Sequence, residues 1–273
     1  MIKKNILNPK YKYLLPLKTK SIRVGSNFDG GYIIREQDIN LIEEIISFGM
    51  GSDYEDWSFE LNFLEKKKVE IYYYDHTVSI KNYISNIFKT FRRIIKLRYK
   101  FKKLSKELLN FYKYITLIKF NKINHLKKRI CSSPESVFEV NPKKIFSNIK
   151  SNKILLKIDI EGGEYDIIDD IFDYHEKLVS ILIEFHNINI LEKKFEEKIK
   201  KLKSKFEIIH LHGNNNGVKI SDNLPTTLEV TFVNKKYINE KIEKKYNYDF
   251  PIKGLDFPNN PSEPDLSFSF EQF

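Results

Sequence analysis

Short apolar runs alternate with amphipathic stretches along most of this chain. Runs of this length between helical patterns are typical of buried strands in a parallel α/β sheet. Alternating residues after the last run predict a hairpin, and hence one antiparallel strand. We therefore predict an α/β fold with helices on both faces of a mostly parallel sheet. Its expected strands are residues 45–48, 69–74, 123–131, 154–160, 179–185, 208–211 and 226–235.

The stretch KILLKIDIEGGEYDIIDD, residues 153–170, is the centre of this pattern. It predicts a buried strand that ends on acids and a Gly pair, followed by a helix that begins at about Glu164. Asp159, Glu161 and Glu164 would then lie at the carboxyl edge of the sheet, where open α/β folds bind their ligands. Glu161 and Glu164 can also be explained as acids that favour a helix N-terminus.

A Gly-rich turn follows the first of these strands. Gly49-x-Gly51 separates that strand from a helical stripe, and Asp75 ends the next strand, 26 residues after Gly49. This geometry lets a nucleotide approach the backbone while an acid holds its ribose hydroxyls. The third glycine of the dinucleotide pattern is missing, and Asp53 stands two residues after Gly51. We predict nucleoside binding at this turn.

Residues 78–122 are predicted to form a basic amphipathic helical insertion. Apolar residues recur there at spacings of three and four. Residues 78–128 contain fifteen Lys or Arg and one acid, Glu107, a net charge of +14, whereas the remainder carries −4 of the total +10. The apolar stripe is explained by packing against the core, or by a membrane surface or partner helix. The basic side is explained by a solvated helix face or by an anionic partner.

The remaining features of the sequence limit the class of protein to which it can belong. We expect a single domain over residues 1–273, with an extended, Pro-rich tail over residues 250–273 laid on the surface. One cysteine, Cys131, excludes an internal disulfide and favours a reduced, cytoplasmic setting. The basic N-terminal stretch lacks the apolar core of a secretory signal, and no apolar run reaches 18 residues.

Right-handed crossovers bring the carboxyl ends of the parallel strands to one edge of the sheet. The residues expected there are Gly49, Asp75 with His76, Asp159 with Glu161, His186 and His212. His186 is the preferred proton acceptor, because the histidine pKa suits neutral pH. Asp159 and His212 are alternatives, and a strand-end histidine can also simply hydrogen-bond a loop. A metal site from Asp159, His186 and His212 is a further alternative, but no two of these fall in a chelating motif, so we predict none.

Several segments resemble the FkbM family of S-adenosylmethionine-dependent methyltransferases. They are ISFGMGSDYEDWSFE, YYYDHT, ILLKIDIEGGEYDIIDDI, IEFHNI and LHGNN with PTTLEVTF, over roughly residues 20–235. The resemblance implies a seven-stranded, Rossmann-like class I methyltransferase fold and O-methylation, often of a sugar or polyketide. Ser47 stands where such enzymes commonly carry an acid, Asp53 replaces a third glycine, and the insertion after Asp75 is longer than expected.

Under this resemblance the cofactor is S-adenosylmethionine. Gly49 and Gly51 would lie near its methionine part, Asp75 would hold the ribose hydroxyls, and Ser132 or Ser133 would lie near the adenine. Asp53 and His76 are also expected to bind the cofactor. The acceptor is expected to be an anionic sugar, such as a glycan, a nucleotide sugar or a lipid-linked saccharide, with peripheral membrane contact through residues 80–120. Two other hypotheses are a non-catalytic module that binds nucleic acid or anionic membrane through its basic helices, and a dinucleotide-dependent oxidoreductase.

Overall fold

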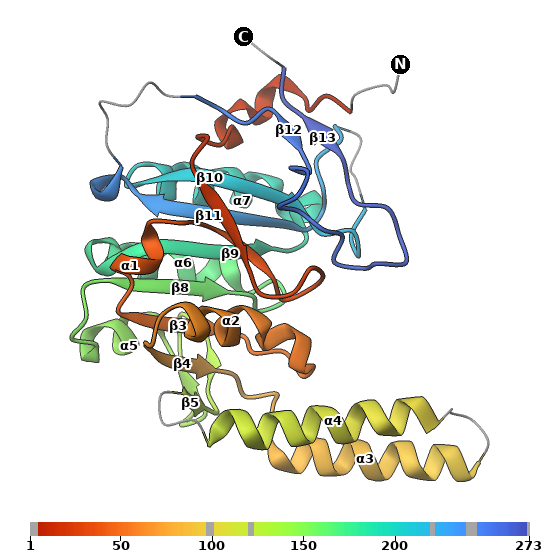
Figure 1. Cartoon of the computed structure of the whole chain (residues 1–273). Helices are drawn as coiled ribbons and strands as arrows, with labels where there is room; N and C mark the ends of the chain where they lie inside the picture. Colours follow the sequence, from red (N-terminus) through yellow and green to blue (C-terminus); the bar gives the residue numbers. More distant parts are fainter. Residues whose placement is uncertain (1–4, 97–100, 120–122, 219–221, 239–244, 272–273) are drawn as a thin grey trace.

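A computed structural model describes residues 5–96, 101–119, 123–218, 222–238 and 245–271. Its centre is a seven-stranded sheet in the order β10-β11-β9-β8-β3-β4-β5 (Figure 1). β11 is antiparallel to β9 and β10, and the other neighbouring pairs are parallel. The strands are β3 (Glu44–Phe48), β4 (Glu70–Tyr74), β5 (Ile123–Leu126), β8 (Ile154–Ile158), β9 (Leu178–Phe185), β10 (Phe206–Gly213) and β11 (Leu228–Asn234).

The strand order identifies the fold. Counted along the chain within this sheet, the strands lie in the order 3-2-1-4-5-7-6, with only the seventh antiparallel. This is the sheet of class I methyltransferases, so the predicted fold is confirmed. β8 is fully buried on both faces and lies in the middle of the sheet, as its continuous apolar sequence predicted.

Two layers cover the sheet. Because side chains alternate across each strand, the buried residues fall into two separate apolar clusters. One cluster is formed with α5 (Pro142–Asn148), α6 (Glu164–Phe172) and α7 (Ile188–Lys203). The other is formed with the β-hairpin β1 (Ser21–Val24) and β2 (Tyr32–Arg35), with α2 (Ser58–Lys66), and with the bases of α3 and α4. Figure 1 shows α6 and α7 behind the sheet and α1 (Asp38–Leu41) and α2 in front of it.

The basic segment forms two helices packed on each other, α3 (Ile80–Ile95) and α4 (Phe101–Ile118). Ser79 caps α3 by accepting a hydrogen bond from the Asn82 N–H at 3.1 Å. Only the base of the pair joins the core, where Tyr83 and Tyr114 are buried and Tyr114 packs on Trp57. The rest projects from the sheet at the end where the parallel strands finish (Figure 1). Within the described residues, no helix is long and apolar enough to cross a membrane.

The C-terminal segment is built into the fold. β12 (Asp249–Phe250) pairs with β13 (Phe268–Ser269), and the rings of Phe250 and Phe268 stack at 5.3 Å. Between these strands, Asp256 and Asn259 are buried: Asp256 Oδ1 lies 2.9 Å from His210 Nε2 of β10, and Asn259 donates to Glu229 of β11 at 2.8 Å. The predicted Pro-rich tail therefore contributes to the core as well as covering the surface. The remaining elements are η1 (Pro9–Leu14), η2 (Tyr54–Trp57), β6 (Arg129–Ile130), β7 (Glu139–Val140), η3 (His175–Lys177) and η4 (Lys235–Tyr237).

Candidate active site

A cavity of about 280 Å³ lies at the carboxyl ends of β3, β8 and β9. The turn before β2 and the loop after β10 complete its wall, so residues far apart in the sequence meet there. This is the edge at which open α/β sheets bind ligands. Its lining includes Asp29, Tyr32, Gly49, Met50, Gly51, Asp56, Lys157, Asp159, Glu161, Glu184, His186, Asn214 and Thr227.

The Gly-rich turn after β3 is shaped by its contact with the loop after β8. Gly49 has φ +85°, and a Cβ atom there would lie 1.7 Å from the backbone oxygen of Asp159. Gly51 has φ +71°, and its Cβ would lie 2.1 Å from the Asp56 carboxylate. Both positions require glycine, because side chains avoid positive φ and there is no space for a Cβ. The backbone of this turn consequently forms part of the cavity wall.

Asp75 links the carboxyl ends of β3 and β4. Its Oδ2 accepts a hydrogen bond from the Met50 N–H at 2.8 Å, and its Oδ1 accepts from the N–H and hydroxyl of Thr77, each at 2.6 Å. The carboxylate therefore fixes the Gly-rich turn against the loop after β4. Each oxygen has two lone pairs, so some acceptor capacity is left for a ribose hydroxyl, and that role stays a prediction.

A second cavity, of about 320 Å³, lies on the other side of this turn. Ser52, Thr77, Ser79, Asn82 and Tyr83 are among its lining residues, so it borders the loop that Asp75 holds. Gly49, Met50 and Gly51 line the first cavity, and the next residue, Ser52, lines the second. A ligand that follows the turn would meet an acidic cavity at one end and, at the other, a polar cavity whose lining includes Lys89.

The other predicted cofactor residues line neither of these two cavities. His76 and Ser132 are both exposed, and neither lines the two cavities. Asp53 is half-buried, and its Oδ2 forms a 2.6 Å ion pair with Lys106 of α4. The proposed contacts of His76, Ser132 and Asp53 with a cofactor stay predictions.

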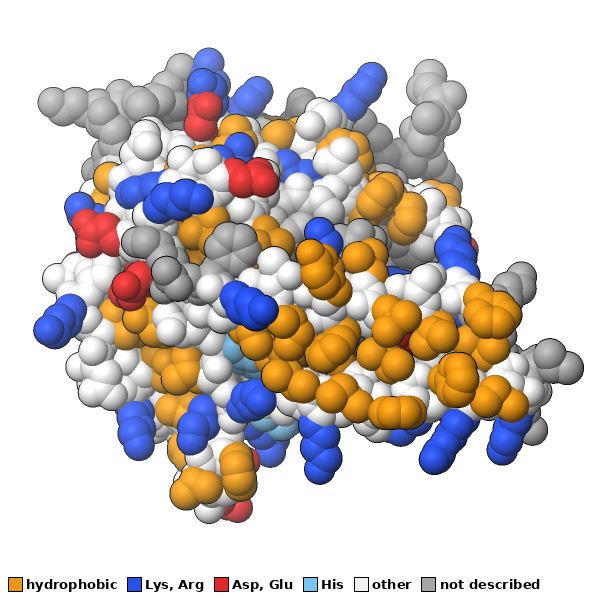
Figure 2. All heavy atoms as spheres, turned by 60° about the horizontal axis from the view of Figure 1, so that its bottom comes forward, with side chains coloured by type: hydrophobic (Ala, Val, Ile, Leu, Met, Phe, Trp, Pro, Cys, Tyr) orange, Lys and Arg blue, Asp and Glu red, His pale blue; other side chains and the backbone are white. Residues whose placement is uncertain are grey.

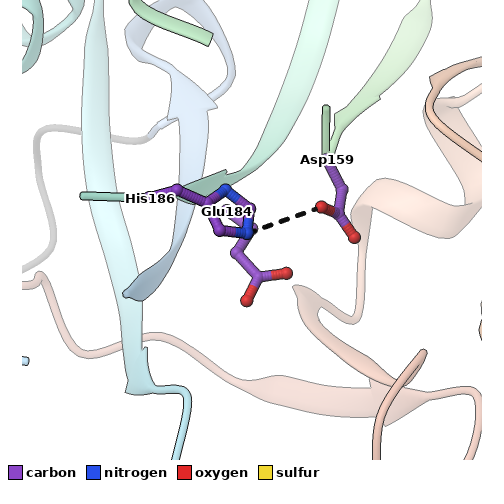
Figure 3. Close-up of side chains that lie close together, drawn as sticks. All are labelled: Asp159, Glu184 and His186. Atoms are coloured by element: carbon purple, nitrogen blue, oxygen red, sulfur yellow. Dashed lines mark ion pairs between the residues drawn. The ribbon is translucent and has the colours of Figure 1, made fainter. Parts of the chain in front are cut away.

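Three side chains converge at the β8–β9 side of the cavity (Figure 3). Asp159 follows β8, Glu184 lies near the end of β9, and His186 follows it. The Nε2 atom of His186 is 4.0 Å from Asp159 Oδ1, and one donor atom from each of the three residues lies within 4.8 Å of the others. The positions of Asp159 and His186 at strand ends predicted that they would meet, but nothing predicted that Glu184 would join them. Its signal was a lone charged residue in an otherwise apolar strand.

His186 is held in place by a buried carboxylate. Glu164, at the start of α6, accepts from His186 Nδ1 at 3.0 Å and from the Gly162 N–H at 3.0 Å. With Nδ1 held in this bond, Nε2 lies 4.0 Å from Asp159 Oδ1 and 3.6 Å from Glu161 Oε2. Burial alone would lower the pKa of His186, but Glu164 and Asp159 outweigh it and raise that pKa. Glu164 is therefore a positioning residue in addition to an acid at a helix N-terminus.

The cavity is acidic. Five carboxylates line it, from Asp29, Asp56, Asp159, Glu161 and Glu184. Burial raises the pKa of Asp159 to about 6 and that of Asp56 to about 7, and it raises the pKa of Glu184 well above its usual range. Buried Lys157 contacts Glu60 Oε1 and the backbone oxygen of Asp56, each at 3.4 Å. A cation entering this cavity is favoured, since it relieves repulsion among the carboxylates.

His212 does not line this cavity, and its ring lies between two acids. Its Nδ1 is 3.3 Å from Glu229, and its Nε2 is 3.1 Å from Asp265 in the C-terminal segment. Burial alone would lower the pKa of His212, but these carboxylates raise it to about 10. An imidazolium held in this way is a poor proton acceptor at neutral pH. The structure therefore argues against His212 as the base and separates it from Asp159 and His186.

The strand order and this edge cavity define a class I methyltransferase fold. No protein-family model and no curated protein matches the chain, so the FkbM resemblance stays a prediction. Solved structures with a similar arrangement include an S-adenosylhomocysteine-bound methyltransferase from Podospora anserina, at 11% identity, TM-score 0.32 and coverage of 71% of this chain and 72% of that one.

Two further solved structures are similar at comparable levels. Precorrin-6y C5,15-methyltransferase from Geobacter metallireducens has 11% identity and TM-score 0.33, with 73% of this chain and 85% of that chain covered. An S-adenosylmethionine-dependent O-methyltransferase from Thermotoga maritima has 12% identity and TM-score 0.33, with 78% and 76% covered. The fold assignment rests on the strand order, which is independent of these likenesses.

Proposed function

We propose that this protein is an S-adenosylmethionine-dependent O-methyltransferase. The observation that supports it most is the pairing of the turn at Gly49 and Gly51 with Asp75 on the adjoining strand of a class I sheet. The residues fit the cofactor: Gly49 and Gly51 leave the backbone of the turn open to the cavity, and the acidic cavity suits a sulfonium cation. Asp75 would hold the ribose hydroxyls while keeping the turn closed.

Methyl transfer to a hydroxyl is an in-line displacement. The acceptor oxygen forms a bond to the methyl carbon, the carbon–sulfur electron pair returns to sulfur, and the hydroxyl proton must leave. The protein contributes positioning of donor and acceptor and a route for that proton. In the metal-free protein His186 is the candidate base, because its Nε2 faces the cavity while Nδ1 is bonded to Glu164. Asp159 lies beside it and stabilises the imidazolium that forms.

The proposed acceptor is a sugar hydroxyl of a glycan, a nucleotide sugar or a lipid-linked saccharide. An acidic cavity disfavours a phosphate at the reaction centre, so the part of the acceptor inside it is a neutral polyol. Any phosphate would instead meet the basic residues of the helical pair. An anionic acceptor is therefore compatible with an acidic cavity, because its phosphate and its sugar hydroxyl would lie at different places on the protein.

Calorimetric titration of the full chain with S-adenosylhomocysteine tests this function. We expect saturable binding, and Asp75→Asn should weaken it by about 10- to 100-fold, because a hydrogen bond to a charged group contributes about 1.5–3 kcal/mol. Asp166→Asn is the matched control, since Asp166 is an exposed carboxylate on α6 that pairs with Lys194. Folded wild-type protein that binds NAD but not S-adenosylhomocysteine would favour the oxidoreductase hypothesis.

The helical pair α3–α4 supports a second part of the proposal, which is contact with an anionic membrane. Large apolar side chains stay exposed along it, including Phe88 at 61%, Ile95 at 68%, Phe101 at 76% and Tyr112 at 66%. Figure 2 shows an apolar band over the helical pair, with Lys and Arg side chains along its edges. An apolar face with a basic rim matches the interior and the charged surface of an anionic bilayer.

This face also lies on the side where the acceptor would arrive. The pair projects at the end of the sheet where the parallel strands finish, which is the end that bears the cavity (Figure 1). A saccharide on a lipid would therefore be held near the cavity by a protein that rests on the same membrane. Membrane binding without cofactor binding would instead favour the non-catalytic module.

A further inference from the structure

The three side chains Asp159, Glu184 and His186 have the spacing of a cation site. Their donor atoms lie within 4.8 Å of one another, and Figure 3 shows the three groups turned toward a common point. Donors around one small divalent ion, with bonds of about 2.1 Å, are separated by about 3–4.2 Å. Small side-chain rotations are enough to bring the three atoms within that range.

The residues that hydrogen-bond His186 and Glu184 are arranged as they usually are around metal ligands. A metal-bound histidine usually donates its second ring N–H to a carboxylate, which fixes the tautomer and aims the free nitrogen. Glu164 accepts that bond from His186, and its own side chain is fully buried. Glu184, only 3% exposed, is oriented in the same way by Asn214, whose amide donates to its Oε1 at 2.6 Å.

The charges around these three side chains are an independent reason to expect a bound cation. Two carboxylates share this buried side of the cavity, and the nearest buried ammonium, that of Lys157, is held by Glu60 on α2. The structure records no ion pair of Lys157 with Asp159 or Glu184 among the described residues. Apart from His186, which lies 4.0 Å from Asp159, no described cationic side chain forms an ion pair with either carboxylate, and a bound divalent cation would stabilise both.

We propose that Asp159, Glu184 and His186 bind one divalent cation. Two carboxylates and one imidazole suit an ion of the Mn²⁺ type better than Ca²⁺, which prefers six to eight oxygens. Thiolate-binding metals find no cysteine here, because the only one, Cys131, lies outside both cavities. The protein would supply three ligands on one side of the ion and leave the cavity side open to oxygens of a substrate.

This site deepens the proposed methyl transfer and rests on it for its role. With Nε2 of His186 occupied by the cation, the imidazole would no longer accept the proton. The cation would lower the pKa of a bound hydroxyl, which would lose its proton to solvent water before the methyl group is transferred to its oxygen. The open side selects acceptors that offer two neighbouring oxygens. We therefore assign the acceptor to the class of vicinal diols, such as a sugar ring with adjacent free hydroxyls.

Mn²⁺ titration of the full chain, followed by calorimetry and by the electron paramagnetic resonance signal of free Mn²⁺, tests the site. We expect one Mn²⁺ per chain. Glu184→Gln should remove most of the affinity, and the positioning variant Glu164→Gln should weaken it by about 10- to 100-fold. Glu161→Gln is the matched control: it removes the same charge 3.6 Å from His186, but from a side chain that is 88% exposed.

The outcomes separate the two proposals. Equal weakening by Glu161→Gln and Glu184→Gln would mean nonspecific attraction to acidic charge and would overturn the site. No saturable Mn²⁺ binding by a wild-type protein that still binds S-adenosylhomocysteine would overturn the site and leave the methyltransferase proposal standing. Circular dichroism of each variant confirms that it is folded, and a Mn²⁺-induced rise in the wild-type melting temperature that Glu184→Gln abolishes would support the site without an activity assay.

Discussion

Gly49 and Gly254 offer a direct test of how closely the turn after β3 packs on the loop after β8. Their backbones are nearly the same, with φ +85° and +82°. A Cβ at Gly49 would lie 1.7 Å from the backbone oxygen of Asp159, whereas a Cβ at Gly254 would meet nothing within 4 Å. Alanine at the two positions therefore introduces the same backbone strain but very different steric contact.

The expected losses of stability follow from the backbone strain and from the steric contact. Left-handed backbone costs a non-glycine residue about 1–2 kcal/mol, which is the whole expected effect of Gly254→Ala. Gly49→Ala adds overpacking against Asp159, about 1–3 kcal/mol. The free energy of unfolding of Gly49→Ala should thus be about 2–5 kcal/mol below that of wild type. That is a large part of the 5–15 kcal/mol typical of a domain.

Urea unfolding followed by tryptophan fluorescence measures both variants, because the single tryptophan, Trp57, is fully buried. The turn and the loop that carries Asp159 must separate to admit the new methyl group. S-adenosylhomocysteine and Mn²⁺ binding should therefore also weaken in Gly49→Ala and stay unchanged in Gly254→Ala. If the two variants lose equal stability, the close packing of the turn on Asp159 is refuted.

Two further predictions concern His212 and the α3–α4 pair. The folded pKa of His212, about 10, exceeds the unfolded value of about 6.5, so its stabilisation is full below pH 6.5 and lost as pH rises through 10. His212→Gln should lower stability at neutral pH by about 3–5 kcal/mol and flatten the stability profile between pH 6.5 and 10, and an unchanged urea profile would contradict this. Phe88→Ser with Ile95→Ser should abolish sedimentation with phosphatidylserine vesicles, whereas Ile190→Ser, at a 75% exposed position on α7, should not. Binding to nucleic acid but not to vesicles would reject the membrane proposal.

Much of the fold was predictable because its signals are local. The apolar runs, the Gly-rich turn and the acids at strand ends each follow from neighbouring residues, and the period of the basic segment predicted its helices. Asp159 and His186 were paired correctly, since both directly follow parallel strands and such ends share one edge of the sheet. His212 also lies near the carboxyl end of a strand, β10. Its ring, however, lies between Glu229 and Asp265 and does not line the cavity.

The sequence by itself determined the order of the strands and helices along the chain and the edge of the sheet at which the candidate site residues lie. Apolar periodicity and the right-handedness of the crossovers are enough for both predictions. Only the tertiary structure decided which polar groups meet. It brought Glu184 to the cavity, placed Glu164 behind His186, and turned Asp75 onto the Gly-rich turn. Those contacts depend on the register between strands and on side-chain direction, which are set by packing across the whole sheet and not by any one segment.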